Sequence, residues 1–356
     1  MKIALLTDTH WGARNDSLSF LEYFHRFYDN VFFPYLREHN IQNCIHLGDI
    51  VDRRKYINFN TLRALKYRFV EPLRDMGVDF KVIIGNHDVM YRNTNEVNAM
   101  HEIFGDSDYV QYFDSPETIA PDGCEILIMP WINRENYADA MKAIKETTAQ
   151  ICFGHLEVNG HLMMPGVYCD HGIPQDAFKK FEMVCSGHFH HRNAIGNVTY
   201  LGCPYEMNWS DYNQSKGFHI FDTDTRELTF IRNPYKMYHK LWYDDEEQTD
   251  VPSVDLSELK DSYIKVIVQS KTNPYWFDMF MDRVYKADPE HVQIVDDHKN
   301  LDKVPDEEIV DEAEDTLTIL NKYVDSIPDK EVDDKAKAQL SVLLHGLYND
   351  AIHMEA

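Results

Sequence analysis

Between residues 8 and 190, five short motifs of carboxylate, amide and imidazole side chains each directly follow an apolar run of strand length. Carboxylates, one amide oxygen and neutral imidazoles make a mixed oxygen and nitrogen ligand set, which suits manganese, iron or a similar divalent ion better than calcium. Because no cysteine belongs to this set, a structural zinc site is disfavoured. The motifs are Asp8-Thr9-His10, Gly48-Asp49-Ile50-Val51-Asp52, Gly85-Asn86-His87-Asp88, Gly154-His155 and Gly187-His188-Phe189-His190.

Asp49 is the natural bridge between two metal ions, because its carboxylate offers two oxygens. Two ions held about 3.5–4 Å apart clamp the attacking and leaving oxygens of a phosphoryl displacement and lower the pKa of a bound water. Each motif alone has a plainer explanation as a helix cap, a turn or a structural histidine. Their joint occurrence at the ends of strands favours a two-metal site that hydrolyses phosphoesters.

Such motifs need a fold that brings separate strand ends together. Apolar runs at residues 3–7, 43–47 and 80–84 alternate with helical patterns at 18–38 and 59–75. This alternation predicts a layered α/β fold, in which ligands gather at the carboxyl ends of the strands. Further segments favour a β-sandwich flanked by helices: strands at 125–129, 151–153 and 181–186, a helix at 134–147, and antiparallel strands at 198–201, 217–221 and 227–231.

The composition changes at an acidic stretch over residues 244–250, which we interpret as a linker. We therefore predict a catalytic domain at 1–243 and a small α/β capping domain at 251–296. Two amphipathic helices, separated at Pro328, make up a third region at 305–356. Its apolar positions either pack within the region or present a docking face to a helical partner: Leu317, Leu320, Val324, Leu340, Leu343, Leu344 and Leu347.

The net charge of −25 argues against direct binding of nucleic acid by the chain as a whole. Most of this acidity belongs to residues 241–356, which carry 29 acidic and 11 basic side chains. No apolar run is long enough to span a membrane, and the sequence begins in a strand without a signal peptide. Six scattered cysteines, several within apolar runs, fit core positions in a reducing compartment. We therefore expect a cytoplasmic protein, in a host cell if the chain is phage-encoded.

The ordered series of motifs, DxH, GDxxD, GNHD, GH and GHxH, resembles the calcineurin-like metallophosphoesterase superfamily. Within it, residues 154–160, 200–204 and 216–218 resemble the SbcD-type double-strand-break-repair nucleases, including those of T-even-like phages. The motif resemblance spans roughly residues 3–222, whereas the C-terminal third matches only in layout. It implies a metallophosphoesterase β-sandwich flanked by helices, a capping domain that binds DNA, and a C-terminal helix pair.

The resemblance also implies roles for the motif residues. His87 would stabilise the transition state or protonate the leaving 3′ oxygen, with Asp88 orienting it. Asp52 stands where archaeal and eukaryotic relatives have a second catalytic histidine, so it either acts in catalysis, pairs with a neighbouring arginine, or supports a ligand. Two ions, manganese or else magnesium, would be bound, the first by Asp8, His10, Asp49 and His190, and the second by Asp49, Asn86, His155 and His188.

The implied activity is hydrolysis of DNA phosphodiesters, as a 3′ to 5′ exonuclease and a single-strand endonuclease that process DNA ends in recombination and repair. The implied partner is an SMC-like coiled-coil ATPase, bound through the C-terminal helix pair. The family also forms homodimers through helices of the nuclease domain, here 59–75 and 95–104, which gives a heterotetramer with the ATPase. Basic and aromatic side chains close to the motifs either contact phosphate or lie on solvated loops: Arg14, Arg53, Arg54, Tyr56 and Arg92.

Two other functions compete with this interpretation. Residues 48–53 also resemble the GDxVDR stretch of serine/threonine protein phosphatases, which predicts a metallophosphatase acting on phosphoprotein or small phosphoesters. The GHxH ending and the additional C-terminal regions favour the nuclease branch. A non-enzymatic scaffold that recruits an ATPase is the second alternative, and the complete ligand set with His87 intact argues against it.

Overall fold

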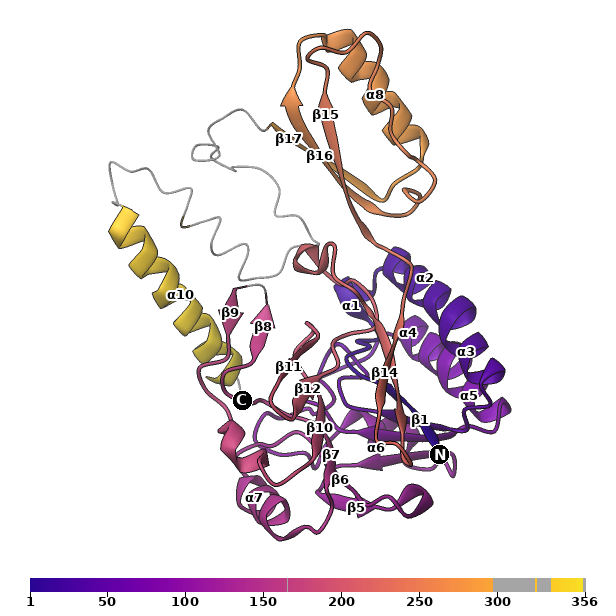
Figure 1. Cartoon of the computed structure of the whole chain (residues 1–356), viewed down its shortest axis with the longest axis vertical. Coiled ribbons are helices and arrows are strands. Elements are labelled where there is room, and N and C mark those ends of the chain that lie inside the picture. Colours follow the sequence, from indigo (N-terminus) through magenta and orange to yellow (C-terminus); the bar gives the residue numbers. More distant parts are fainter. Residues whose placement is uncertain (165, 297–323, 325–333, 355–356) are drawn as a thin grey trace. The chain divides into compact units, whose positions relative to one another are not determined.

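The structure is a computed structural model, and it describes residues 1–164, 166–296, 324 and 334–354. The chain divides into two compact units (Figure 1). The first unit contains Met1–Tyr205 and Asn213–Tyr235. The second unit contains Glu206–Tyr212 and the described residues from Lys236 onward.

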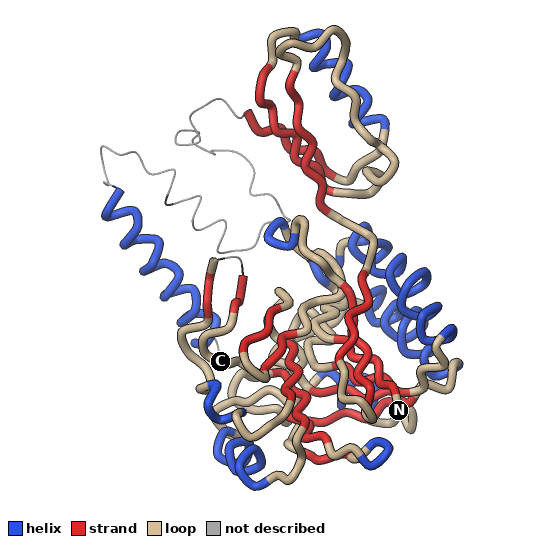
Figure 2. The backbone as a smooth tube through the Cα atoms, viewed as in Figure 1, coloured by secondary structure: helices blue, strands red, loops and turns tan. Residues whose placement is uncertain are grey.

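Two six-stranded β-sheets pack against each other in the first unit (Figure 2). Their core includes Ile3 and Ile45 from one sheet and Ile128 and Phe153 from the other. This β-sandwich confirms the predicted layered α/β class. The first sheet has the order β14-β13-β1-β2-β3-β4, and these strands are β1 Lys2–Leu6, β2 Asn43–His46, β3 Asp79–Ile83, β4 Val110–Phe113, β13 Gly217–Asp222 and β14 Leu228–Arg232. The second has the order β11-β12-β10-β7-β6-β5, with β5 Glu117–Ile119, β6 Ile126–Met129, β7 Ile151–His155, β10 Met183–Gly187, β11 Asn193–Ile195 and β12 Val198–Tyr200.

Helices pack on the outer side of both sheets. Aromatic contacts fix them to the first sheet, where Phe32 lies 5.0 Å from Phe218 and Phe69 lies 5.5 Å from Phe80 between ring centroids. Each of the two long predicted helices contains a π-helical turn, so the structure divides it into three elements. The first comprises α2 Leu18–Phe27, η1 Tyr28–Phe32 and α3 Phe33–Glu38, and the second comprises α4 Phe59–Ala64, η2 Leu65–Val70 and α5 Glu71–Asp75.

The remaining elements of the first unit are short. Helix α7, Tyr137–Glu146, packs on the second sheet through Ala140 and Ile144. Of the three strands expected to be antiparallel, β13 and β14 pair in that way, whereas β12 is antiparallel only to β11 and runs parallel to β10. The other elements are α1 Ala13–Asp16, α6 Ala99–Phe104, η3 Pro121–Gly123, α7 Tyr137–Glu146, β8 Leu162–Met164, β9 Val167–Tyr168, η4 Gln175–Phe178 and, in the second unit, η5 Trp209–Asp211.

Parallel pairing aligns the strands that precede the motifs. In the first sheet β1 pairs with β2 and β2 with β3, and in the second sheet β7 pairs with β10, all in parallel. The register places Leu6 beside His46 and His155 beside Gly187. The strands of each sheet therefore end together, which delivers the polar residues that follow them to one edge of the sandwich.

In the second unit, a three-stranded parallel sheet has one of its faces covered by a helix. Its strands are β15 Tyr238–Asp244, β16 Tyr263–Ser270 and β17 His291–Asp296, in that order, and its helix is α8 Pro274–Lys286. Val266 and Val268 of β16 pack against Phe280 and Val284 of α8 in a separate core.

The boundary predicted at residue 243 is corrected by β15, a strand that the sequence analysis did not identify. Because β15 pairs with β16 along its length, the second unit begins at Lys236. The acidic stretch after it does not act as a simple linker. Asp245 is buried, and its carboxylate accepts hydrogen bonds from the backbone amides of Thr272 and Asn273 and from the hydroxyl of Tyr243.

Helix α10, Asp334–Met354, corresponds to the second helix of the predicted C-terminal pair. Leu343 and Leu347 are 58% and 53% exposed, Leu340 and Leu344 are half-buried, and Val324 is buried. The predicted docking residues Leu317 and Leu320 lie outside the described residues. Among the described residues, the structure contains no helix with the length and hydropathy needed to cross a membrane.

Candidate metal centre

The seven predicted ligands come together at the carboxyl edge of the sandwich. Asp8, Asp49 and Asn86 follow β1, β2 and β3 of the first sheet. His155 ends β7 and His188 follows β10 in the second sheet. The side chains of these two sheets form mixed carboxylate and imidazole groups, within which the candidate ligand atoms all lie within 4.8 Å of one another.

The first group surrounds His10. Its Nε2 lies 3.1 Å from Nε2 of His190 and 3.8 Å from Oδ2 of Asp49. Nε2 of His190 lies 3.9 Å from Oδ1 of Asp8. Zinc-like ions bind imidazole nitrogen at about 2.0–2.1 Å, so two nitrogens on one ion would be about 3–3.4 Å apart. The spacing of the two imidazoles therefore fits shared coordination of one ion.

The second group surrounds His155. Its Nε2 lies 3.0 Å from Oδ1 of Asn86 and 3.3 Å from Oδ2 of Asp49. Nδ1 of His188 lies 2.8 Å from the same amide oxygen. A single oxygen of Asp49, Oδ2, thus faces the imidazoles of both groups, whereas the prediction rested on the carboxylate having two oxygens to offer. The donor chemistry fits manganese, magnesium or iron better than a thiophilic ion.

Several of these residues have unusual backbone conformations. Asp8, His10, Asp49 and His188 have φ values of 51°, 43°, 55° and 88°, in the left-handed region that side chains other than glycine rarely adopt. Such strain persists at functional sites when the surrounding structure holds it in place. Gly48 has a φ of 98°, and a Cβ there would lie 2.3 Å from Nδ1 of His155, so only glycine fits.

Two of the predicted ligand histidines have a neighbouring oxygen for their other ring nitrogen. Nδ1 of His155 donates to the carbonyl of Leu47 at 2.7 Å, and Nδ1 of His10 lies 3.4 Å from Oδ1 of Asp52. Such outer partners fix the tautomer and the orientation of a metal-binding imidazole. The carboxylate of Asp52, predicted as a catalytic residue, thus lies beside a predicted ligand, as expected for the supporting role that the sequence left open as an alternative.

His87 lies beside both groups. Its Nδ1 donates to the backbone carbonyl of Asp52 at 2.6 Å, and its backbone amide donates to Oδ1 of Asp49 at 2.7 Å. The rings of His87 and His10 are 4.8 Å apart between centroids. Burial lowers the pKa of His87 below its ordinary value, although Asp49 opposes this shift. At neutral pH, Nδ1 therefore holds the proton and Nε2 carries a lone pair.

The structure gives Asp88 a different role from the predicted orientation of His87. The buried carboxylate of Asp88 accepts hydrogen bonds from four backbone amides, those of Asp49, Ile50, Val51 and Gly85, at 2.8–3.1 Å. It is the carbonyl of Asp52 that holds the His87 ring. Asp88 instead joins the loop after β2 to the loop after β3. Burial and the Asp49 carboxylate raise the pKa of Asp88 to about 7, whereas the amide donors favour its ionised form.

We expect Asp88→Asn to lower the free energy of unfolding by about 2–5 kcal/mol, because the amide nitrogen cannot accept from the backbone and leaves buried N–H groups unpaired. Urea unfolding of the metal-free protein measures this change. Asp75→Asn, at a carboxylate that is 69% exposed, is the matched control and should change the free energy by less than about 0.5 kcal/mol. Equal stability of both variants would show that the four contacts of Asp88 do not hold the two loops together.

The charge of the ligand histidines links metal binding to pH. Burial lowers the pKa of His155, but the Asp49 carboxylate outweighs it and raises the pKa to about 9. Burial likewise opposes protonation of His10, and the Asp52 and Asp49 carboxylates raise its pKa to about 9. In the metal-free protein both imidazoles are therefore protonated at neutral pH.

We expect metal affinity to increase between pH 6 and pH 8, because the ion must displace the protons on His10 and His155. The affinity for manganese should rise by about tenfold per pH unit for each proton released. Calorimetric titrations in buffers with different ionisation enthalpies count those protons directly. An affinity that stays constant or falls over this pH range would contradict the raised pKa values.

The predicted substrate-binding residues differ in their surroundings. Arg53 is held by Asp16 and Asn15, with nitrogen to oxygen distances of 2.8 and 2.7 Å, and its guanidinium lies over the exposed ring of Tyr56. Arg54 differs from Arg53, because its Nη1 is buried without a hydrogen-bond partner among the described residues. Burial and the neighbouring charge of Arg92 lower its pKa. Arg14 lies within α1, at a position with a left-handed φ of 53°.

Sequence reasoning missed two residues beside the second group. The ring of Trp131 lies 5.0 Å from that of His188 and 6.1 Å from that of His155 between centroids. Trp131 follows β6 by two residues, so the rule that placed the motifs at strand ends would also have found it. Oε1 of Glu157 lies 3.6 Å from Nε2 of His188. Glu157 lies in a loop two residues beyond His155, within the stretch 154–160 that carries the family resemblance, but the resemblance gave it no role.

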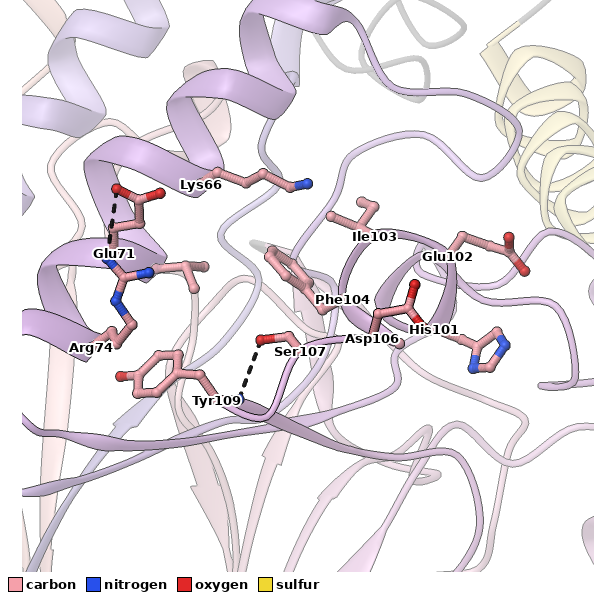
Figure 3. Close-up of a pocket in the computed structure, with 12 residues that line it drawn as sticks. Lys66, Glu71, Arg74, His101, Glu102, Ile103, Phe104, Asp106, Ser107 and Tyr109 are labelled. Atoms are coloured by element: carbon pink, nitrogen blue, oxygen red, sulfur yellow. Dashed lines mark hydrogen bonds and ion pairs between the residues drawn. The ribbon is translucent and has the colours of Figure 1, made fainter.

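A separate pocket of about 540 Å³ in the first unit contains none of the predicted metal or catalytic residues (Figure 3). It is lined by η2, α5, α6 and the loop that follows α6, which include parts of both helical segments predicted for self-association. Its walls carry both charges, with Lys66 beside Phe104 and an ion pair between Arg74 and Glu71.

The β-sandwich and its edge of carboxylates and imidazoles define a metal-dependent phosphoester hydrolase. Residues 1–192 match the sequence profile of the calcineurin-like phosphoesterases, and the chain belongs to this family. It is 34% identical over 246 residues to exonuclease subunit 1 of Enterobacteria phage T4, covering 68% of this chain and 71% of that protein. It is 28% identical over 109 residues to the SbcD subunit of the nuclease SbcCD of Staphylococcus epidermidis, covering 28% of this chain and 29% of that protein.

Among solved structures, an archaeal phosphodiesterase matches 65% of this chain and 100% of its own, with 14% identity and a TM-score of 0.33. A likeness at that level supports no further conclusion. The family match and the two related sequences confirm the class predicted from the motifs, a metal-dependent hydrolase of the calcineurin-like type with nuclease relatives.

Proposed function

We propose that the chain is a two-metal DNA nuclease, acting as a 3′ to 5′ exonuclease and a single-strand endonuclease on DNA ends. The observation that carries this proposal is the Asp49 carboxylate, whose Oδ2 lies 3.8 Å from Nε2 of His10 and 3.3 Å from Nε2 of His155. One carboxylate therefore joins two ligand groups, as phosphodiester hydrolysis with two metals requires. The names of both relatives, an exonuclease subunit and a nuclease subunit, support DNA as the substrate.

Bound manganese ions would supply a hydroxide nucleophile and neutralise charge on the scissile phosphate. The chain's own residues set the spacing of the ligand groups, orient the imidazoles and transfer a proton. Asp49 fixes the spacing of the two groups, and Asp52 and Leu47 hold the imidazoles of His10 and His155 in place. Because Nδ1 of His87 donates to the carbonyl of Asp52, Nε2 is the nitrogen that can bind a proton from solvent beside the negative charge of a phosphodiester and donate it to the leaving oxygen.

Substrate preference tests this proposal. The purified chain should cleave single-stranded and duplex DNA in the presence of manganese, and a chelator should abolish cleavage. Labelling each end of the DNA separately distinguishes 3′ to 5′ digestion from internal cuts. Rapid hydrolysis of phosphoprotein or a small phosphomonoester with no cleavage of DNA would retain the metal chemistry but assign the chain to the phosphatases.

The face of the second unit's sheet that points away from α8 supports its proposed role in binding DNA. Lys240 and Lys265 lie side by side on β15 and β16, on the face away from α8. Their ammonium groups lie 4.7 and 4.3 Å from the ring centroids of Tyr212 and Trp209. Trp242, two residues beyond Lys240, is 53% exposed. Lysines interleaved with aromatic rings suit a single strand, because phosphates bind the charges and bases stack on the rings.

We expect the double variant Lys240→Gln/Lys265→Gln to bind single-stranded DNA more weakly and with a smaller dependence on salt. For each phosphate that the variant no longer binds, the slope of log affinity against log salt should become shallower by about 0.7. Fluorescence anisotropy at several salt concentrations measures both effects. Lys286→Gln is the matched control, because Lys286 is exposed on α8, which covers the opposite face. An unchanged slope in the double variant would exclude this face.

We also propose that the chain assembles with a coiled-coil ATPase and with a second copy of itself. The relatives' names describe subunits, which supports a partner protein. The exposed Leu343 and Leu347 of α10 provide apolar surface for the ATPase. Phe59 and Tyr67 are 87% and 57% exposed on the segment proposed for self-association. Analytical ultracentrifugation of the chain alone, and of a Phe59→Lys variant, tests the homodimer.

A further inference from the structure

The two ring nitrogens of His188 face different partners. Nδ1 lies 2.8 Å from Oδ1 of Asn86, on the side of the proposed second ion, and Nε2 lies 3.6 Å from Oε1 of Glu157. A neutral imidazole that gives its Nδ1 lone pair to a metal must carry its proton on Nε2. That proton needs an acceptor, and the carboxylate of Glu157 lies on the same side of the ring.

A similar arrangement recurs at two of the other proposed ligand histidines. Nδ1 of His155 donates to the carbonyl of Leu47, and Nδ1 of His10 lies 3.4 Å from the carboxylate of Asp52. An outer acceptor raises the basicity of the metal-bound nitrogen and holds the ring in the orientation for binding. Glu157 would complete this set for His188.

We propose that Glu157 is a positioning residue for the second metal ion, acting through the Nε2 proton of His188. The inference rests on the proposed two-metal function. It assigns Glu157 to the proposed second ion alone, because the His10 and His190 imidazoles of the first group have other neighbours. It therefore predicts a defect confined to one of two ions.

A second segment of the chain holds Glu157 in place. Nε2 of His171 lies 3.2 Å from Oε1 of Glu157, and the backbone amide of Ile173 donates to the carbonyl of Glu157 at 2.8 Å. Gly172 has a φ of 81°, and a Cβ there would lie 2.5 Å from that carbonyl, so glycine permits this close approach. The segment that includes β8 and β9 thus begins at Glu157 and contacts this residue again through His171.

The same residues could instead form a separate ion site, since Glu157, Cys169 and His171 place their donor atoms within 4.8 Å of one another. The surroundings of Cys169 argue against this. Its thiol is buried and donates to the carbonyl of His171 at 3.2 Å, and burial raises its pKa to about 11. A neutral thiol that is already hydrogen-bonded is a poor ligand. The 3.2 Å contact between His171 and Glu157 is instead that of an outer pair supporting His188.

Manganese titration of the full chain tests the inference, with calorimetry for affinity and electron paramagnetic resonance for the spin-coupled pair of ions. In Glu157→Ala we expect the second manganese to bind about 10–100-fold more weakly and the coupled signal to decrease, with the first manganese unchanged. Glu157→Gln, which keeps an oxygen acceptor, should be intermediate. Asp170→Asn is the control, because this carboxylate also contacts His171 but is 90% exposed.

Three results would overturn the inference. The first is tight binding of two ions by Glu157→Ala, and the second is equal weakening of both ions. The third is an additional ion, detected as cobalt–thiolate absorption, that Cys169→Ser removes. A wild-type chain that binds fewer than two manganese ions would instead contradict the proposed function. If the metal-free variants unfold at the same midpoint temperature as the metal-free wild-type chain, any loss of metal binding is a local effect and not a loss of folding.

Discussion

Asp49→Ala should abolish binding of two manganese ions and reduce DNA cleavage by at least about 1,000-fold, the upper range for removal of one electrostatic stabiliser. The physical reason is that Oδ2 of Asp49 faces both ligand groups, at 3.8 Å from His10 and 3.3 Å from His155. Its other oxygen accepts from the backbone amide of His87 at 2.7 Å. One substitution therefore removes a ligand from both ions and loosens the loop that carries His87.

Manganese content after gel filtration and the initial rate of cleavage measure the two effects in the same samples. Asp122→Asn is a suitable control, because Asp122 is 52% exposed and pairs only with the N-terminus among the described residues. It should retain both ions and wild-type activity. An Asp49→Ala protein that binds two ions normally would show that a different residue bridges them.

His87→Asn should leave two manganese ions bound and still reduce kcat by about 100- to 10,000-fold, the usual contribution of a general acid or base. Nδ1 of His87 is committed to the carbonyl of Asp52, so Nε2 is the nitrogen that meets substrate. Asparagine keeps a donor for that carbonyl but cannot transfer a proton. The defect should therefore appear in kcat rather than in metal affinity.

Separate measurement of metal binding and single-turnover cleavage distinguishes His87 from a ligand. His39→Asn, at an exposed histidine hydrogen-bonded to Tyr35, controls for loss of a histidine as such. If His87→Asn loses one ion, His87 is a ligand. If it loses neither ion nor activity, the non-enzymatic scaffold becomes the better account of the chain.

The sandwich and the position of its metal centre were predictable because their signals are local. An apolar run followed by a polar motif marks the end of each strand, and parallel pairing brings those ends together. The proposed ligands Asp8, Asp49 and His155 are all of this kind. Their assignment to individual ions came from the family resemblance and stays a prediction, which the short distances among these side chains support.

Contacts between loops that are far apart in sequence were not predictable in this way. The carboxylate of Asp88 accepts a hydrogen bond from the backbone amide of Asp49, which lies 39 residues away. Glu157 lies 31 residues from His188. Neither contact leaves a periodic pattern in the sequence. The pattern within GNHD suggested that Asp88 would orient its neighbour His87, whereas the carboxylate contacts the preceding loop instead.

The boundary between the units was misplaced for a related reason. Strand β15 has the sequence YHKLWYD, in which Tyr238 and Tyr243 are both buried, so it shows no simple alternation of apolar and polar residues. The charges that follow it resemble a linker. One of these charges, the Asp245 carboxylate, is instead buried and accepts hydrogen bonds from the amides of Thr272 and Asn273, which lie 27 and 28 residues further along the chain.

The central claim is that two bound ions act together on DNA, and cleavage rate measured against bound manganese tests it most directly. Manganese is titrated into the metal-free chain, and bound ion and cleavage of labelled single-stranded and duplex DNA are measured in each sample. We predict little cleavage with one ion bound and a steep rise as the second binds. Full DNA cleavage with one ion bound, or none with two, would contradict the account.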